Sequence, residues 1–137
     1  MKVIHQPQTK ITESKVITEL KECILYFFLL KTDRKDSVIE LKIDGQRIQH
    51  TAEELYGLGL TRRSNWLYCA KYDESAGLYV ICWSPPRLEV RSLKITLIPQ
   101  TTTTAEWLLI YQPLEKPKPE KQETEERKGL LGLGLLR

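Results

Sequence analysis

The sequence has few of the residues from which catalytic and metal sites are most often built. Its 137 residues include three cysteines, two histidines and one methionine. His5 lies in what we expect to be a mobile terminus, and His50 stands apart from it, so no zinc-ligand spacing is present. Cys23, Cys69 and Cys82 each lie in an apolar stretch, which predicts reduced thiols in a core. The sequence therefore predicts no metal centre, no disulfide framework and no cofactor.

Long apolar runs and leader-like segments are absent as well. The longest apolar run, from Cys23 to Leu30, is far shorter than the roughly 20 residues that cross a bilayer. The first residues show neither the apolar segment of a secretory signal nor an Arg/Ser-rich leader. We therefore expect a soluble, cytoplasmic protein without a membrane span.

Sequence motifs of the common enzyme classes are also missing. There is no Gly-x-Ser-x-Gly and no Gly-rich phosphate loop, and the pair Gly57 and Gly59 lacks a third glycine and follows an expected helix. Glu53 and Glu54 are adjacent, so they do not share a helix face, and Asp73-Glu74 is explained by turn formation. The sequence thus predicts that the protein is not an enzyme, and we predict no catalytic residue. The alternative is an enzyme whose residues are scattered beyond recognition.

A change in composition at residue 113 divides the chain. Residues 1–112 carry nearly all the β-branched and aromatic residues, and the overall content of 41% hydrophobic and 28% charged residues is ordinary for one globular domain. Residues 113–128 combine proline with charges of both signs, which predicts a flexible linker. Residues 129–137 are apolar again. We expect one domain (1–112), a linker (113–128) and a docking peptide (129–137).

Strand signals dominate the first 112 residues. Val38–Ile43 alternates apolar and polar side chains and is followed by Asp44-Gly45, which predicts a hairpin with a type I′ turn that returns through Gln46–Ile48. Apolar residues on both faces of Ile24–Lys31 predict a central strand that is covered on both faces and turns into the Val38 strand. The remaining expected strands are Trp66–Tyr72 and Leu78–Trp83 as a second hairpin, Leu88–Ile98 with a bulge near Arg91–Ser92, and Trp107–Tyr111.

Helical signals are fewer. Thr51 followed by Glu54 is a capping box, and Gly57 or Gly59 in the left-handed conformation could end that helix. Residues 12–21 are ambiguous, but the helical spacing of their apolar residues favours a short helix over a strand. The predicted fold class is α+β, mainly antiparallel β with about six strands, one or two short helices and a disordered C-terminal tail.

The last nine residues are apolar although they follow a charged linker. Gly132 and Gly134 each disfavour a helix by about 1 kcal/mol. An apolar peptide on a flexible tether is typical of a docking motif, whose alternatives are a disordered tail, a membrane contact or a strand returning to its own domain. We predict that this segment binds a protein partner through Leu130, Leu131, Gly132, Leu133, Gly134, Leu135 and Leu136.

The nonapeptide 129–137 resembles the cargo-loading peptides at the C-termini of proteins packed inside encapsulin shells. Those peptides resemble Gly-Ser-Leu-Gly-Ile-Gly-Ser-Leu followed by Lys or Arg, after a flexible and often proline-rich linker. Leu131, Leu133 and Leu136 match the apolar anchors, whereas Leu130 and Leu135 stand where serine is usual. The resemblance covers nine residues, and the folded part does not resemble the usual cargo enzymes. It implies that the partner is a shell protein.

The competing interpretation is a small nucleic-acid-binding module. Guanidinium groups beside exposed aromatic rings can hold phosphates and stack on bases, and the candidate residues here are Arg62, Arg63, Trp66 and Tyr68. The net charge of +3 permits such contact without indicating it. A basic stripe would need the fold to bring together Lys31, Arg34, Lys35, Arg87, Arg91 and Lys94. The long alternating strands also allow edge-to-edge pairing into a homodimer.

Overall fold

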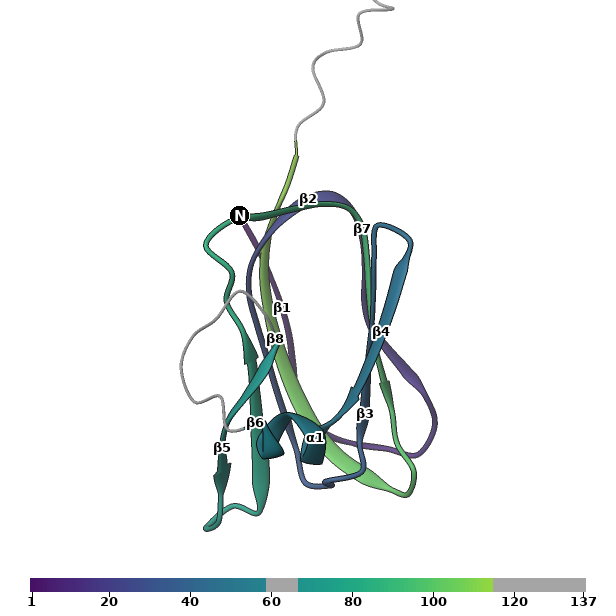
Figure 1. Ribbon diagram of the computed structural model, residues 1–137, viewed down its shortest axis with the longest axis vertical. Coiled ribbons are helices and arrows are strands. Elements are labelled where there is room, and N and C mark those ends of the chain that lie inside the picture. Colours follow the sequence, from purple (N-terminus) through teal and green to yellow (C-terminus); the bar gives the residue numbers. More distant parts are fainter. Residues whose placement is uncertain (59–66, 115–137) are drawn as a thin grey trace, which may run out of the picture.

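Antiparallel strands make up most of the computed structural model, which describes residues 1–58 and 67–114 (Figure 1). The described part has eight strands rather than the expected six or so, and one short helix. The elements are β1 (Lys2–Ile11), β2 (Lys15–Thr32), β3 (Val38–Ile43), β4 (Gln46–Thr51), α1 (Ala52–Gly57), β5 (Tyr68–Asp73), β6 (Leu78–Trp83), β7 (Leu88–Ile98) and β8 (Thr103–Pro113). The first residue of the predicted linker, Pro113, belongs to β8, and Leu114 is also described, so the domain extends slightly beyond the expected boundary at residue 112. The rest of the predicted linker (115–128) and the docking peptide lie outside the described residues.

The long strand β2 connects two layers of one continuous sheet. Its first part, residues 15–25, pairs with β7, whereas residues 23–32 pair with β8 and residues 28–32 also pair with β6. Glu22, where the partners change, has a φ of 49°. One layer therefore has the order β4-β3-β7-β2, and the other has the order β1-β8-β2-β6-β5. The two layers lie face to face in Figure 1.

The prediction of a central strand at Ile24–Lys31 is confirmed, but β2 does not pair with β3, because β7 lies between them. The short helix expected over residues 12–21 is wrong, since most of this segment belongs to β2. A register shift between Val16 and Thr18 explains the misleading pattern. Such a bulge adds one residue to a strand, so Ile17 and Leu20 are both turned inward at a three-residue spacing.

The mobile N-terminus expected around His5 is also wrong. Residues 2–11 form β1, which pairs with β8 along most of its length and is interrupted by a register shift between Gln6 and Thr9. The sequence of β1 carries few apolar residues, so its strand character comes from backbone pairing with β8.

The β3–β4 hairpin forms as predicted. Asp44 and Gly45 have φ values of 49° and 89°, as a type I′ turn requires, and Ile43 pairs with Gln46 across it. The Asp44 carboxylate accepts hydrogen bonds from the backbone N–H groups of Arg91 (2.7 Å) and Ser92 (3.0 Å). The bulge expected near Arg91–Ser92 is wrong, because the β2–β7 register runs unshifted from Lys21 to Cys23, opposite these residues. The change of phase coincides instead with the bend of β2 at Glu22.

Helix α1 closes the end of the two layers that lies opposite the exit of β8 (Figure 1). The capping box is confirmed: the Glu54 N–H donates to Thr51 Oγ1 (3.0 Å), and the Thr51 N–H donates to Glu54 Oε1 (2.8 Å). The helix ends at Leu58 in a right-handed conformation, so Gly57 is not a left-handed cap. Gly59 lies outside the described residues.

The second predicted hairpin forms from β5 and β6. The Asp73 carboxylate accepts hydrogen bonds from the Ser75 hydroxyl (2.8 Å) and the Ala76 N–H (3.3 Å), which confirms its role in the turn. The last strand begins at Thr103 rather than Trp107, because β-branched threonines fit a paired strand.

The core lies between the two layers and is closed by α1. Its largest fully buried side chains include Trp83, Phe28, Leu30 and Leu55. The three cysteines are free, as predicted. Cys23 and Cys69 are buried in the core, but Cys82 is partly exposed and is not a core residue, so the expected core position is wrong for this thiol. Burial raises the pKa of each of these thiols, which lowers their reactivity as nucleophiles.

Candidate interaction surface

The outer face of the β4-β3-β7-β2 layer is polar. At its centre, Glu40 is 9% exposed and accepts hydrogen bonds from Arg47 Nε and from Gln49 Nε2 (2.9 Å). Arg47 and Gln49 come from the neighbouring strand β4. The hydrogen bond from Arg47 is the main reason that the pKa of Glu40 lies below its ordinary value of 4.5. Arg47 and Gln49 are themselves exposed, so the face is a polar surface whose neighbouring strands are joined by side-chain contacts to the buried Glu40.

Low pH is expected to reduce the free energy of unfolding, partly through protonation of Glu40. Its pKa is lower in the folded than in the unfolded chain, so its contribution to stability is complete above pH 4.5 and is lost as the pH falls through the folded pKa. Glu40→Gln should therefore reduce the loss of unfolding free energy between neutral and acidic pH. Urea unfolding of both proteins across this pH range measures the difference. Arg47→Gln should have the same effect, and an unchanged pH dependence in both variants would contradict the role of this pair.

The outer face of the other layer is apolar where solvent-facing sheets usually carry polar side chains. We call it the apolar face and define it by Val3 of β1, Phe27 and Leu29 of β2, Val80 and Cys82 of β6, and Leu108 and Ile110 of β8. Leu29 pairs with Leu108 on one side and with Cys82 on the other, and Phe27 pairs with Ile110. These residues alternate with the core residues Phe28, Leu30 and Leu109, so they point away from the core.

The exposure of these side chains shows that nothing in the described part of the chain covers the apolar face fully. Phe27, Leu29, Cys82, Leu108 and Ile110 are all partly exposed, and Val3 is 61% exposed, whereas Val80 is buried. The described residues therefore do not give the strand at Ile24–Lys31 the cover on both faces that its sequence predicts. Contiguous exposed apolar patches of this kind mark interaction sites on soluble proteins.

The two ends of the apolar face differ in charge. At the end nearer α1, Lys31 of β2 pairs in register with Glu106 of β8, and both side chains are partly exposed. At the other end, the Tyr26 hydroxyl donates a hydrogen bond to Gln112 Oε1 (3.1 Å). One end therefore carries a charge of each sign on adjacent strands. The other end carries an uncharged hydrogen-bonded pair, and Met1 and Arg87 line a pocket together with Gln112 there.

Most site residues named from the sequence lie outside the described part of the chain. These are the seven residues of the docking peptide and Arg62, Arg63 and Trp66. Tyr68 lies in β5 opposite Cys82 and is 7% exposed, which leaves little of its ring open to a stacking base. Sequence reasoning missed the apolar face, although its signal is present: Phe27 and Leu29 alternate with Phe28 and Leu30, and both faces of β2 are apolar.

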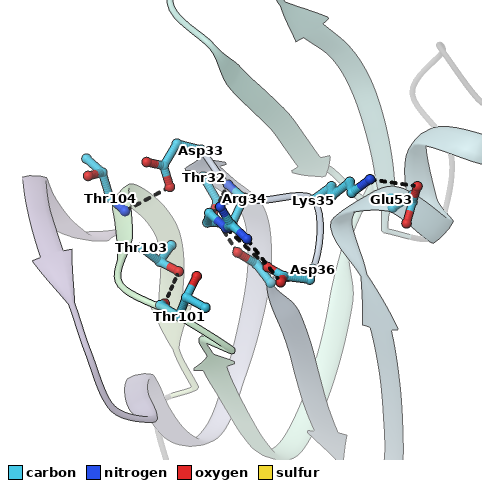
Figure 2. Close-up of polar contacts among 10 residues, drawn as sticks. Thr32, Asp33, Arg34, Lys35, Asp36, Glu53, Thr101, Thr103 and Thr104 are labelled. Carbon is cyan, nitrogen blue, oxygen red and sulfur yellow. Dashed lines mark hydrogen bonds and ion pairs between the residues drawn. The ribbon is translucent and has the colours of Figure 1, made fainter.

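The residues of the expected basic stripe are not brought together. At the end near α1, Arg34 pairs with Asp36 (3.4 Å) and Lys35 with Glu53 (3.9 Å), as Figure 2 shows. Arg87 pairs with Glu89 (3.5 Å) at the start of β7, where the chain enters from the opposite end. The turn near α1 is further fixed by Asp33, whose carboxylate accepts a hydrogen bond from the Thr104 N–H (2.9 Å).

No group of three or more His, Cys, Asp or Glu side chains suited to a metal ion occurs within residues 1–58 and 67–114. No helix within the same ranges is long and apolar enough to cross a membrane. No protein-family model matches the chain, and a comparison with curated proteins finds no significant similarity.

Proposed function

We propose that this chain is a non-enzymatic adaptor that acts by binding proteins. The observation that carries the proposal is the apolar face. A sheet that needed only to be soluble would place polar side chains there, as the opposite layer does with Glu40, Lys42 and Lys94. Leaving apolar side chains in water has no benefit for the isolated domain, whereas covering them with a protein partner removes apolar area from water.

The second binding element of the proposed adaptor is the docking peptide, residues 129–137. The described chain ends at Leu114, whose N–H donates to the carbonyl oxygen of Glu22 (2.9 Å), so the start of the linker is fixed at one end of the sheet. A chain as long as residues 115–128 spans about 20 Å when unstructured. The terminal leucines can therefore reach a partner beyond the domain surface. The resemblance to cargo-loading peptides favours a shell protein as that partner, in the cytoplasm.

Removal of the docking peptide is expected to abolish capture of its partner and to leave the domain folded. The chain ending at Lys128 should no longer co-sediment with an encapsulin shell, the probe that the resemblance indicates, whereas the intact chain should. The reason is that apolar anchors provide the affinity and the linker provides only reach.

A matched control keeps the full length and replaces Leu131, Leu133 and Leu136 with serine. It should behave like the truncated chain, and both should show the thermal unfolding of the intact protein. Equal co-sedimentation of all three chains would show that the docking peptide is not the binding element.

A further inference from the structure

The charged residues at the end of the apolar face indicate which molecule covers it. We propose that it is the interface of a homodimer, in which two copies pack face to face about a twofold axis that runs parallel to the strands, along the seam between β2 and β8. The dimer is a separate inference from capture of a partner by the docking peptide, and each is tested by its own measurement.

The rows of residues that cross the β2–β8 seam are self-complementary under this symmetry. A twofold axis along the seam places β2 of each copy over β8 of the other at the same level. Lys31 then faces Glu106 of the second copy, and Glu106 faces its Lys31. In the next row, Leu29 faces Leu108 of the second copy. The same twofold rotation therefore places each of these two charged side chains opposite one of opposite charge, and each of these two leucines opposite a leucine.

The alternative twofold axis, perpendicular to the strands, does not give this match. It would place the end with Lys31 and Glu106 over the end of the second copy that carries Tyr26 and Gln112. These two side chains are uncharged and already hydrogen-bonded to each other. Lys31 would then lie over the uncharged Tyr26 and would lose the carboxylate that the parallel axis places opposite it, at a cost in desolvation. The charge pattern thus selects the axis parallel to the strands.

The size of the layer suits a stable interface. Under this axis β1 lies over β6 of the second copy and β5 has no counterpart, so four strands face each other. With a spacing of about 4.8 Å and a rise of about 3.4 Å per residue, these four strands have an area of roughly 600 Å², at the lower end of the range for specific interfaces. Stable interfaces bury about 800 Å² per partner. Its centre is aliphatic and aromatic apart from the exposed His5 of β1, which pairs in register with Leu108. Lys31 and Glu106 lie at one end, as in interfaces with an apolar core and a polar rim.

The parallel axis has a consequence for the proposed function. Both copies of β8 run in the same direction, so both Leu114 residues lie at the same end of the dimer. If the docking peptide binds as proposed, the dimer presents two peptides toward one repetitive surface. Bivalent attachment of this kind can raise the apparent affinity by about 10²–10⁴.

The first test is self-association of the full-length chain, measured by sedimentation velocity over a concentration series. We expect a reversible dimer. Leu108→Glu, which places a charge in the centre of the interface, should weaken it by about 100-fold or more. Val16→Glu is the matched control, because Val16 is an exposed apolar residue (44%) on the outer face of the other layer, and it should dimerise like the parent chain. Circular dichroism establishes that both variants are folded.

The second test fixes the axis by mixing two charge variants. Lys31→Glu alone places two acidic residues opposite two acidic residues, and Glu106→Lys alone places two basic residues opposite two basic ones. The dissociation constant of each homodimer should be about tenfold higher than that of the parent dimer, or more. The mixture should form a heterodimer as stable as the parent, because every charge then faces its opposite across the axis. Native mass spectrometry resolves the three species.

A full-length chain that stays monomeric, or a Leu108→Glu variant that dimerises like the parent, overturns the homodimer. A dimer in which the mixed charge variants show no preference for the heterodimer overturns the parallel axis. A monomeric chain that still binds shells through residues 129–137 would refute only the dimer. A dimer that fails to bind shells would refute only the proposed adaptor function.

Discussion

Phe28→Ala is expected to lower the free energy of unfolding by about 3–5 kcal/mol. Phe28 is fully buried at the centre of β2, where it pairs with Trp83 of β6 on one side and with Leu109 of β8 on the other. Removing its ring leaves a cavity that the rigid sheet on both sides cannot close. A domain of this size is stable by only about 5–15 kcal/mol, so the variant loses a large share of its stability.

The neighbouring residue provides the matched control. Phe27 has the same side chain, one position away on the same strand, but it lies on the apolar face and is partly exposed. Phe27→Ala should cost the monomer clearly less than Phe28→Ala, about 1–2 kcal/mol, because its ring is already partly exposed to water. It should instead weaken the proposed dimer.

Urea unfolding at low protein concentration, in the Leu108→Glu background, compares the two substitutions without a contribution from association. The midpoint should fall strongly for Phe28→Ala and slightly for Phe27→Ala, with similar slopes. Equal losses would mean that the two rings have equal environments and would contradict the assignment of inner and outer faces on β2.

Asp44→Ala is expected to destabilise the protein by about 2–3 kcal/mol. The substitution removes one carboxylate oxygen that accepts hydrogen bonds from two backbone N–H groups, those of Arg91 and Ser92. It also places alanine at a φ of 49°, which asparagine and aspartate tolerate better than other side chains. Both effects act at the point where the β3–β4 turn is fixed to β7.

Asp44→Asn separates these contributions from the charge. Asparagine keeps an acceptor oxygen at the same position and accepts a positive φ, so its cost should be under about 1 kcal/mol. Thermal unfolding of the three proteins gives the comparison. If alanine and asparagine were equally destabilising, the negative charge would be the important property, and the two hydrogen bonds would not be.

The two hairpins and the helix cap were predictable because their signals are local. Asp44-Gly45 and the pair Thr51 and Glu54 each determine the conformation of a few adjacent residues, with little help from the rest of the chain. The polar strand β1 and the first half of β2 were not predictable in this way. β1 depends on backbone pairing with β8, about 100 residues away, and the bulge in β2 gave its apolar residues a helical spacing.

The candidate binding elements also differ in whether the sequence alone could identify them. The docking peptide and its linker are visible in the sequence because composition alone marks them, and their role remains a proposal. The apolar face could not be located from the sequence, because the sequence pattern does not distinguish an apolar strand residue that faces the core from one that faces solvent.

The sequence by itself determined the strand-rich class, the turns, the cap and the reduced state of the cysteines. Each depends on side-chain chemistry or on neighbours within a few residues. Only the tertiary structure decided that β2 bends between two layers, that Arg34 and Arg87 lie at opposite ends, and that Phe27 faces outward while Phe28 faces the core. These properties depend on which distant strands pair and in what register, and a shift of one residue would exchange the two faces of a strand.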